Sequence, residues 1–344
     1  MRVLMTAGLY SLGGFSTVVE NLANELGKKG VDVTISALMF KRIPPKGAYN
    51  VCKIPIVNVS RLRKFLDYFD IVHNHHPITN YLDLISRQHF IYHYHGAPNL
   101  GRGNLFKFSM LSSIKVTKHR FNAIIAVSET GRAELEQYFN LKRVHVIYNG
   151  VDTGLFKVGL EERFRNGTPQ YLFVGNLYKH KKVEELILAL KELTKTYPKA
   201  HLQIVGGGHD QAKLKSLVSR LNFQKHASFV GFVPPSKLPY YYSSCDVYVT
   251  ASRCELFPLP LIEAWACGKP VVASSIPAHA ELLSKSKAGI LYKTGDLEDL
   301  CANMILAYTK SASFKNYAIQ FAKTNEWSAV AEKALTIYNE LMKT

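Results

Sequence analysis

Short apolar runs that resemble buried β-strands alternate with amphipathic helical patterns along most of this chain. In the first half the strand-like runs are RVLMTA, VDVTISAL, DIVHNHH, HFIYHYHG and NAIIAVS, and the helical pattern TVVENLANELGKKG separates the first two. Near-continuous apolar strands are typical of parallel sheets with both faces covered. Since parallel neighbours need a crossover connection, usually a helix, the alternation predicts a doubly wound α/β fold.

A second series of the same kind begins at YLFVGNL and continues through HLQIVGGG, ASFVGFV, DVYVTAS and KPVVASS. A chain of 344 residues is long for one hydrophobic core, so two Rossmann-like domains facing a central cleft are expected. The segment before the second series ends in Gly, Asn, Thr and Pro, which favour loops. The predicted domains are residues 1–160 and 161–312, followed by C-terminal helices over 313–344 that pack back towards the first domain.

Composition and charge restrict the class of protein and its partners. The chain has no apolar run of about 18 residues and no secretory leader, and its five cysteines form no C-x-x-C pair, so a cytoplasmic protein without a disulfide framework is expected. A net charge of +17 favours an anionic partner, which could be a phosphorylated substrate, an acidic membrane surface or nucleic acid. Because the basic residues are scattered, no nucleic-acid partner is expected.

The stretch SRCELFPLPLIEAWACGKPVV sets Glu255 and Glu263 on either side of a helix start. Proline suits the first helical turn, so Pro258 or Pro260 is predicted to begin a helix that stops at Gly268. The amino end of such a helix attracts anions through its unpaired N–H groups and its dipole. Two carboxylates beside an anion site indicate a ligand with both phosphate and hydroxyl groups.

Glycines and lysines follow other predicted strands. Gly13 and Gly14 separate the first strand from a helix expected to start near Ser16 or Thr17, where bare backbone could approach a phosphate or simply form a tight turn. Gly175 and Asn176 end the first strand of the second domain. The lysines that follow them could neutralise a diphosphate or form a solvated charge run: Lys179, Lys181 and Lys182. The run Gly206-Gly207-Gly208 is weaker evidence and could be only a loop.

Histidines crowd the strand ends of the first domain: His73, His75, His76, His89, His93 and His95. They suggest a metal site, but no paired carboxylate or H-E-x-x-H helix accompanies them. No metal or other cofactor is therefore expected. His95, directly before Gly96 at a strand end, is retained as a candidate site residue.

These motifs together resemble the retaining, nucleotide-sugar-dependent glycosyltransferases of family 4, also called group 1, which have the GT-B fold. The resemblance covers nearly the full chain in the family's order, from SLGGFSTVVENLANELGKKGVDVTI through HYHG, IIAVSE, VIYNGVD and YLFVGNLYKHKKVEELILAL to the E-x7-E signature in ELFPLPLIEAWACGKPVVAS. It implies transfer of a sugar from a nucleotide-diphosphate sugar to a hydroxyl acceptor with retention of configuration.

The resemblance also implies roles for particular residues. Glu255 would face the donor sugar, Glu263 would bind the ribose hydroxyls, and the amides around Phe257 and Leu259 would reach the diphosphate. Lys181 matches the family's lysine on the leaving phosphates, Gly14 its backbone contact, and His95 the histidine that approaches the transferred sugar. Asn176 stands where the family often has arginine, and Leu256 and Pro258 stand where glycines are common. These departures leave the identity of the donor open.

Other readings of the same residues stay open. An epimerase or phosphorylase of this fold, or a non-catalytic nucleotide or polyanion binder, would also use a basic cleft. The acceptor is expected to be a glycan or lipid-linked sugar, and the protein to be either free in the cytoplasm or peripheral on the inner face of the cell membrane. Residues 104–121, NLFKFSMLSSIKVTKHRF, mix apolar residues with Lys115, Lys118 and Arg120, and could contact an anionic membrane or form an ordinary covering helix.

Overall fold

The computed structural model describes residues 1–10, 13–55, 58–96 and 105–343, without the side chains of residues 105–110. The chain forms two compact units: unit 1 comprises Met1–Gly150 and Trp327–Thr344, and unit 2 comprises Val151–Glu326. The first division therefore falls at residue 150 rather than near 160. The C-terminal helical segment is divided as well, because its last helix belongs to unit 1 and the helix before it to unit 2.

Unit 1 is built on a seven-stranded sheet in the order β3-β2-β1-β4-β5-β6-β7, in which every pair is parallel. Its strands are β1 (Arg2–Tyr10), β2 (Asp32–Phe40), β3 (Asn50–Lys53), β4 (Ile71–Asn74), β5 (His89–Tyr94), β6 (Ala123–Ala126) and β7 (His145–Val146). Its helices are α1 (Gly14–Lys28), α2 (Val59–Leu66), the 3-10 helix η1 (Pro77–Leu84), α3 (Leu105–Thr117), α4 (Glu129–Phe139) and α12 (Trp327–Leu341).

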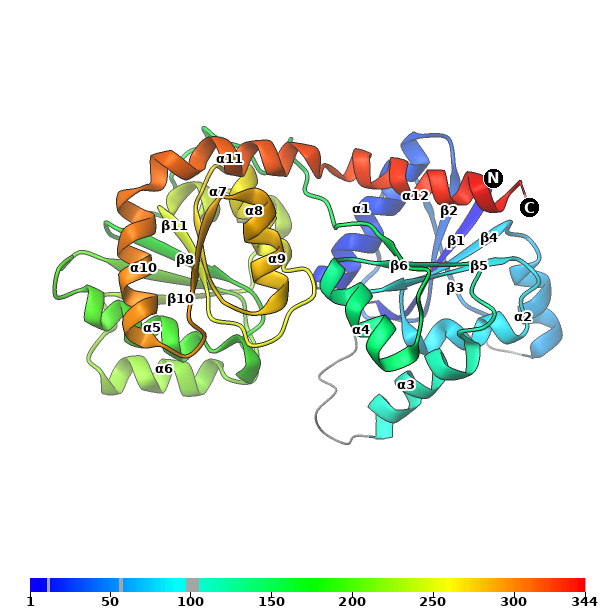
Figure 1. The fold of residues 1–344 in the computed structure, drawn as a ribbon, viewed down its shortest axis with the longest axis horizontal. Helices are drawn as coiled ribbons and strands as arrows, with labels where there is room; N and C mark the ends of the chain where they lie inside the picture. The colour runs from blue at the N-terminus through cyan, green and yellow to red at the C-terminus, as the bar shows by residue number, and fades with distance from the viewer. Residues whose placement is uncertain (11–12, 56–57, 97–104, 344) are drawn as a thin grey trace. The chain divides into compact units, whose positions relative to one another are not determined.

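Both faces of the unit 1 sheet are covered, as expected for near-continuous apolar strands. Helices α1 and α12 pack together on one side (Figure 1). On the other side Leu4, Val72 and Phe90 of the sheet pack with Leu66 of α2 and Leu82 of η1. The chain thus returns to unit 1 through α12, and Gly150 contacts Trp327 so closely that a side chain at 150 would meet the Trp327 backbone.

Unit 2 contains a six-stranded sheet in the order β10-β9-β8-β11-β12-β13, again with parallel pairs throughout. Its strands are β8 (Gln170–Val174), β9 (His201–Val205), β10 (Ala227–Gly231), β11 (Val247–Thr250), β12 (Val271–Ser274) and β13 (Gly289–Tyr292). Its helices are η2 (Lys179–Lys181), α5 (Val183–Leu193), α6 (Gln211–Arg220), η3 (Pro235–Lys237), α7 (Leu238–Ser244), α8 (Leu259–Ala266), α9 (Pro277–Ser286), α10 (Leu297–Thr309) and α11 (Ser311–Thr324).

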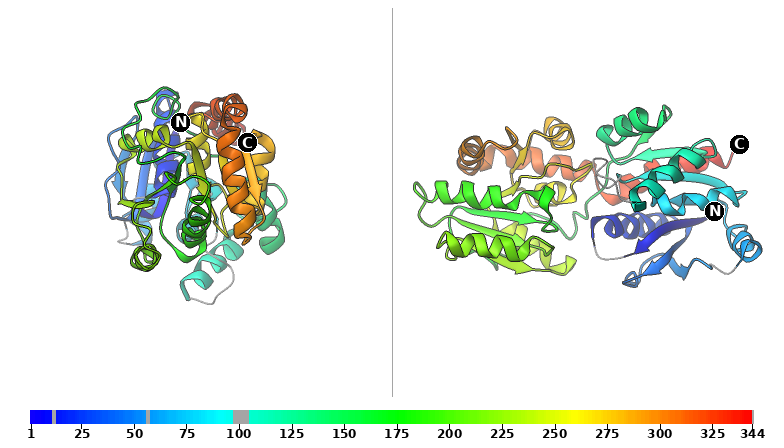
Figure 2. Two further views of the ribbon diagram at one scale, coloured as in Figure 1. Left: turned by 90° about the vertical axis from the view of Figure 1, so that its left-hand side faces the viewer. Right: turned by 90° about the horizontal axis from the view of Figure 1, so that it is seen from below.

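The unit 2 sheet also lies between two helical layers, which two further views show (Figure 2). Helix α5 packs against both α6 and α10, and α5 and α10 also contact strands of the sheet, whereas α8 contacts α7 and α11. The main core lies between the first layer and the sheet and includes Leu186, Leu190, Leu202, Val249 and Met304. The predicted doubly wound α/β fold is therefore confirmed in both units.

The order of the strands shows where each unit can bind a ligand. In unit 1 the direction of winding reverses between β1 and β4, and in unit 2 it reverses between β8 and β11. The loops that follow two such strands run in opposite directions and leave a crevice at the carboxyl ends. The candidate site residues lie in the loops after these strands or after their neighbours, or near the start of the helices that follow.

Candidate active site

The loops after β8 and β11 bring two of the candidate residues of unit 2 together. Lys181 is the last residue of η2, and Glu255 lies between β11 and α8. Their side chains form an ion pair. Both side chains are largely buried, with exposed fractions of 19% and 16%. A charge pair in this environment is screened far less by solvent than a surface pair.

Two further contacts tie the same loops together. The backbone N–H of Arg253 donates to the carbonyl of His180 at 2.7 Å. The Arg253 guanidinium also pairs with Glu185, in the first turn of α5, at 2.5 Å. Lys181 and Glu255 are therefore held on loops that are joined by backbone and side-chain contacts, which favours a preorganised site.

Helix α8 begins as the sequence predicts. Pro258 is its N-cap, Pro260 lies in its first turn, and Gly268 follows its end with a φ of +70°. Among the described residues no side chain caps the amino end of α8, and the side chains of Phe257 and Leu259 are buried. Any ligand contact from these two residues would come through the backbone.

Glu263 lies about one turn into α8 and accepts a hydrogen bond from the Tyr242 hydroxyl at 2.6 Å. Burial raises the pKa of Glu263 to about 7, although the Tyr242 hydrogen bond acts in the opposite direction. The carboxyl group therefore changes charge near neutral pH. A partner that donates hydrogen bonds or carries positive charge would favour its ionised form.

The glycine run after β9 has a structural explanation. A side chain at Gly206 would meet the Gly175 carbonyl, and one at Gly208 would meet the Leu177 carbonyl. In addition, the Leu177 N–H donates to the Gly207 carbonyl at 2.9 Å. These glycines allow the loop after β9 to pack on the loop that holds exposed Asn176, and so they support the site indirectly.

In unit 1, Gly13 and Gly14 lie at the amino end of α1. The helix begins at Gly14, earlier than the predicted start near Ser16 or Thr17, because the second glycine adopts helical geometry. Gly13 has a φ of +149°, and no described atom lies within 4 Å of where its side chain would stand. The bare backbone expected from the sequence is present, and Phe15 follows it.

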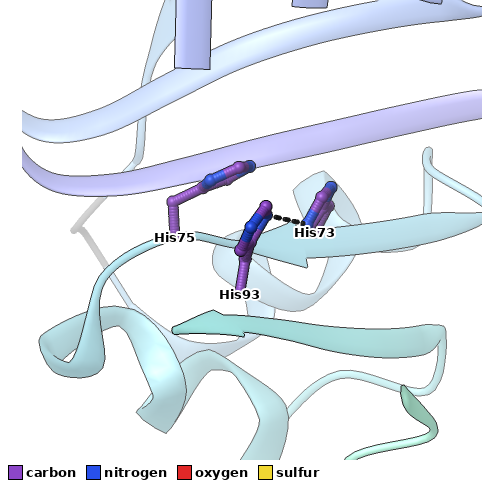
Figure 3. Close-up of side chains that lie close together, drawn as sticks. All are labelled: His73, His75 and His93. Carbon is purple, nitrogen blue, oxygen red and sulfur yellow. Dashed lines mark hydrogen bonds between the residues drawn. The ribbon is translucent and has the colours of Figure 1, made fainter. Parts of the chain in front are cut away.

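The histidines of unit 1 do gather in space. One nitrogen from each of His73, His75 and His93 lies within 4.8 Å of the others, which is the spacing of a possible metal site (Figure 3). However, Nε2 of His73 and Nδ1 of His93 are 3.1 Å apart, and their ring planes differ by 2°. The ring centres are 5.2 Å apart, so both nitrogens lie between the rings and close to the line that joins their centres.

That geometry is a hydrogen bond between coplanar rings. A cation placed between two such opposed nitrogens would lie about 2.0–2.1 Å from each of them. The nitrogens would then be about 4 Å apart, whereas they are 3.1 Å apart. Chelation would therefore require the rings to rotate. His95 belongs to the same group, since its Nε2 lies 3.0 Å from Nδ1 of His75.

Sequence reasoning missed several residues around the unit 2 site. Tyr242 and Arg253 were not predicted, because their partners are distant in sequence. His279, near the start of α9, is buried close to Glu255 and Lys181, and burial lowers its pKa to about 4. Its Nδ1 lies 2.9 Å from the Ser274 carbonyl. Examining the loop after β12 in the same way as the other strand ends would have identified His279.

Comparison with known families covers nearly the whole chain. Residues 12–155 match the family described as Glycosyltransferase Family 4, and residues 161–324 match the family described as Glycosyl transferases group 1. The two matches together include every candidate residue of both units.

Individual relatives have low sequence identity to this chain but match long stretches of it. An uncharacterised glycosyltransferase of Methanocaldococcus jannaschii is 27% identical over 304 residues, which cover 81% of this chain and 77% of that protein. The D-inositol 3-phosphate glycosyltransferase 2 of Catenulispora acidiphila is 26% identical and covers 79% of this chain and 71% of its own. The alpha-monoglucosyldiacylglycerol synthase of Streptococcus pneumoniae is 25% identical over 64% of this chain and 50% of its own.

Solved structures share the fold of the entire chain. Sucrose-phosphate synthase from Thermosynechococcus elongatus superposes with a TM-score of 0.83 at 20% identity and covers 99% of both chains. Anabaena HepE in complex with UDP-glucose superposes with a TM-score of 0.80 at 19% identity and covers 100% of both chains. With its two parallel-sheet units and its consecutive family matches, the chain belongs to the group 1 glycosyl transferases, also described as glycosyltransferase family 4, and has the GT-B fold.

Proposed function

We propose that this glycosyltransferase moves a sugar from a nucleotide-diphosphate sugar to a hydroxyl acceptor with retention of configuration. The observation that carries the proposal is the ion pair of Lys181 and Glu255 at the reversal point of the unit 2 sheet. The complex of Anabaena HepE with UDP-glucose supports a nucleotide-sugar donor.

The chemistry follows from the charges of these groups. Glycosyl transfer builds negative charge on the leaving diphosphate, and preorganised positive charge aimed at those oxygens lowers the barrier. An ammonium has three donors, so Lys181 could keep its contact with Glu255 and still bind a phosphate oxygen. Glu255 would then face the sugar, Glu263 would accept hydrogen bonds from the ribose, and the backbone at Phe257 and Leu259 would bind the diphosphate.

In unit 1, the backbone of Gly13 and Gly14 would contact the donor, and His95 would bind a hydroxyl of the transferred sugar. Asn176 is a neutral donor-binding residue. No metal takes part, because the lysine and backbone donors neutralise the leaving group. Retention requires the acceptor to attack the face from which the diphosphate leaves, and the leaving phosphate can take the acceptor's proton.

An assay of nucleotide release tests transfer against the alternative functions. We expect free UDP, GDP or ADP to appear from the matching nucleotide sugar only when an acceptor is present, and at the same rate in EDTA. An epimerase would change the sugar without releasing nucleotide, and a non-catalytic binder would do neither. Activity that EDTA abolishes and a divalent ion restores would overturn the metal-free mechanism and make the histidines of unit 1 candidates again.

The raised pKa of Glu263 makes a separate prediction about nucleotide binding. A carboxylate accepts hydrogen bonds more strongly than a neutral acid, so the affinity for a nucleoside diphosphate should rise as pH increases towards and through about 7. Glu263→Gln should remove this rise and weaken binding at pH 8 by ~1.5–3 kcal/mol for each lost charged hydrogen bond.

Calorimetry between pH 6 and 8 measures this effect. The same nucleotide is used with both proteins, so its own titration cancels in the comparison. Glu298→Gln, which changes an exposed carboxylate on α10, is the matched control. Equal affinities for Glu263→Gln and the wild type at pH 8 would remove Glu263 from the donor site.

We also propose that the acceptor is a lipid-linked or membrane-surface glycan, since one relative is named for a diacylglycerol glycolipid. None of the helices within the described ranges has the length and apolar composition to cross a bilayer. The stretch 104–121 falls partly outside the description, which omits residue 104 and the side chains of 105–110. In the described part Ile114 is buried, and Lys118 donates to the Phe139 carbonyl at 3.0 Å, as in an ordinary covering helix.

Vesicle sedimentation tests the proposed contact with lipid. At low salt the protein should sediment with anionic vesicles and not with neutral ones, because basic residues near anionic lipid contribute ~1 kcal/mol each. Reversal of Lys115, Lys118 and Arg120 to glutamate should weaken sedimentation. If the wild type ignores anionic vesicles, a water-soluble acceptor is the better assignment.

A further inference from the structure

Four histidines at the ends of β4 and β5 form two hydrogen-bonded pairs that lie against one another. His73 pairs with His93, and His75 pairs with His95. The rings of His73 and His75 are 4.3 Å apart between centres, and those of His93 and His95 are 4.4 Å apart. Of the four, His95 is only partly buried and the other three are fully buried, so His95 is the exposed end of the array.

The position of each proton in the first pair follows from Tyr338 of α12. Its hydroxyl lies 2.5 Å from Nδ1 of His73, and burial raises the pKa of Tyr338, so it remains a phenol. Among the described residues this O–H has no other acceptor than Nδ1 of His73, so Tyr338 is the donor of the bond. A neutral imidazole has one N–H, so His73 carries its proton on Nε2 and donates it to Nδ1 of His93. His93 then carries its proton on Nε2, which has no hydrogen-bond partner in the described part of the chain.

The hydrogen bond between His75 and His95 could run in either direction. The proton positions in the first pair decide between the two. Nε2 of His75 is also buried without a described partner. If His95 donated to His75, two buried N–H groups without acceptors would lie on the rings of His75 and His93, whose centres are 4.9 Å apart. If His75 donates, its Nε2 is instead a lone pair beside the N–H of His93. Since buried N–H groups without acceptors are rare, the second direction is favoured.

We propose that His75 is a positioning residue that holds His95 as its Nδ1–H tautomer, so that His95 offers a hydrogen-bond donor to a hydroxyl of the transferred sugar. The bond from Nδ1–H of His75 to Nε2 of His95 leaves the His95 proton on Nδ1. Phe15, next to Gly14, packs edge-on against the His95 ring at 5.4 Å and limits its rotation. His75 acts only through His95, and this assignment rests on the proposed function.

Nuclear magnetic resonance of the full-length protein tests the tautomer directly. With ¹⁵N-labelled histidine at pH 7.5, long-range proton–nitrogen spectra distinguish Nδ1–H from Nε2–H. We expect His95 to be Nδ1–H in the wild type and to become a mixture or Nε2–H in His75→Leu. In His75→Asn the amide N–H replaces the Nδ1 donor and should restore the tautomer. An Nε2–H form in the wild type, or an unchanged tautomer in His75→Leu, would overturn the proposal.

Kinetics form the second part of the test. His75→Leu should lower kcat/KM for nucleotide release about tenfold, the effect of one lost hydrogen bond, and His75→Asn should recover most of it. His89→Leu, at the start of β5, the strand that precedes His95, is the control and should match the wild type. The spectra need no sugar donor, so a wrong tautomer contradicts the role of His75, whereas a wild type that releases no nucleotide contradicts the proposed transfer reaction.

Discussion

Replacing Lys181 with alanine is expected to lower turnover about a hundredfold, because loss of one preorganised charge-stabilising donor commonly has an effect of this size. The structure adds a second contribution. Glu255 would lose the cation that now pairs with it and would stand as an uncompensated carboxylate at the proposed diphosphate site. Donor binding should therefore weaken as well, so KM should rise while kcat falls.

The double variant Lys181→Ala/Glu255→Gln separates these contributions. Removing the negative charge together with the lysine should recover donor binding but not turnover, and so the two substitutions should be non-additive in KM. Both kcat and KM are measured by nucleotide release. Lys179→Ala, an exposed lysine in the same 3-10 helix, is the control and should lose no more than about half of the turnover. Equal losses in Lys181→Ala and Lys179→Ala would mean that only the general charge of the loop matters.

The architecture could be predicted because it depends on local patterns. Apolar runs alternating with helical periodicity are sufficient to predict parallel strands and crossover helices, and the Pro-Leu-Pro run predicts the start of α8 at Leu259. The start of α1 lies earlier than the sequence predicts, because Gly14 adopts helical geometry instead of forming part of a turn. The boundary near 160 also differed from the structure, because the contact of Gly150 with Trp327 joins residues that are distant in sequence.

The contacts within the site could not be predicted in the same way. The E-x7-E spacing identifies Glu255 and Glu263, but their partners Lys181 and Tyr242 come from other crossover loops and helices. The histidine pairs depend on the register of β4 and β5, in which His73 lies opposite Ile91. A shift of that register by one residue would turn His93 to the face of the sheet opposite to that of His73. The residues were therefore identifiable from the sequence, whereas their pairing required the fold.

Acidification is expected to unfold unit 1 before unit 2. Burial lowers the pKa of five histidines that lie in β4 and β5 or directly after these strands: His73, His75, His76, His93 and His95. The pKa falls to about 4 for His76 and to about 3 for His95, against 6.5 for an ordinary histidine. Below pH 6.5 the unfolded chain therefore binds protons that the folded unit does not, so stability is complete above this pH and falls as pH decreases towards the folded values.

The size of the effect approaches the stability of a domain. A histidine that stays neutral in the folded unit contributes on the order of 1 kcal/mol between pH 7.5 and 5.5, so five together contribute several kcal/mol, compared with ~5–15 kcal/mol for a typical domain. Asp83 acts in the opposite sense, since burial raises its pKa to about 6, and offsets part of the contribution of one histidine. In unit 2 fewer histidines have lowered pKa values: His180, His201 and His279. Unit 2 should therefore keep its structure to a lower pH.

Hydrogen exchange can follow both units in one sample. The protein is incubated at pH values from 7.5 to 5.0 and then labelled by a short pulse at a single pH, so that the intrinsic exchange rate is constant. Peptides from β4 and β5 should lose protection near pH 5 to 5.5, while peptides from β8 and β9 in unit 2 remain protected. His76→Asn removes one titrating group and should reduce the slope of stability against pH by ~1.4 kcal/mol per unit. If β4 and β5 are as protected at pH 5.0 as at pH 7.5, these histidines are not held neutral, and the proton positions inferred for the array lose their basis.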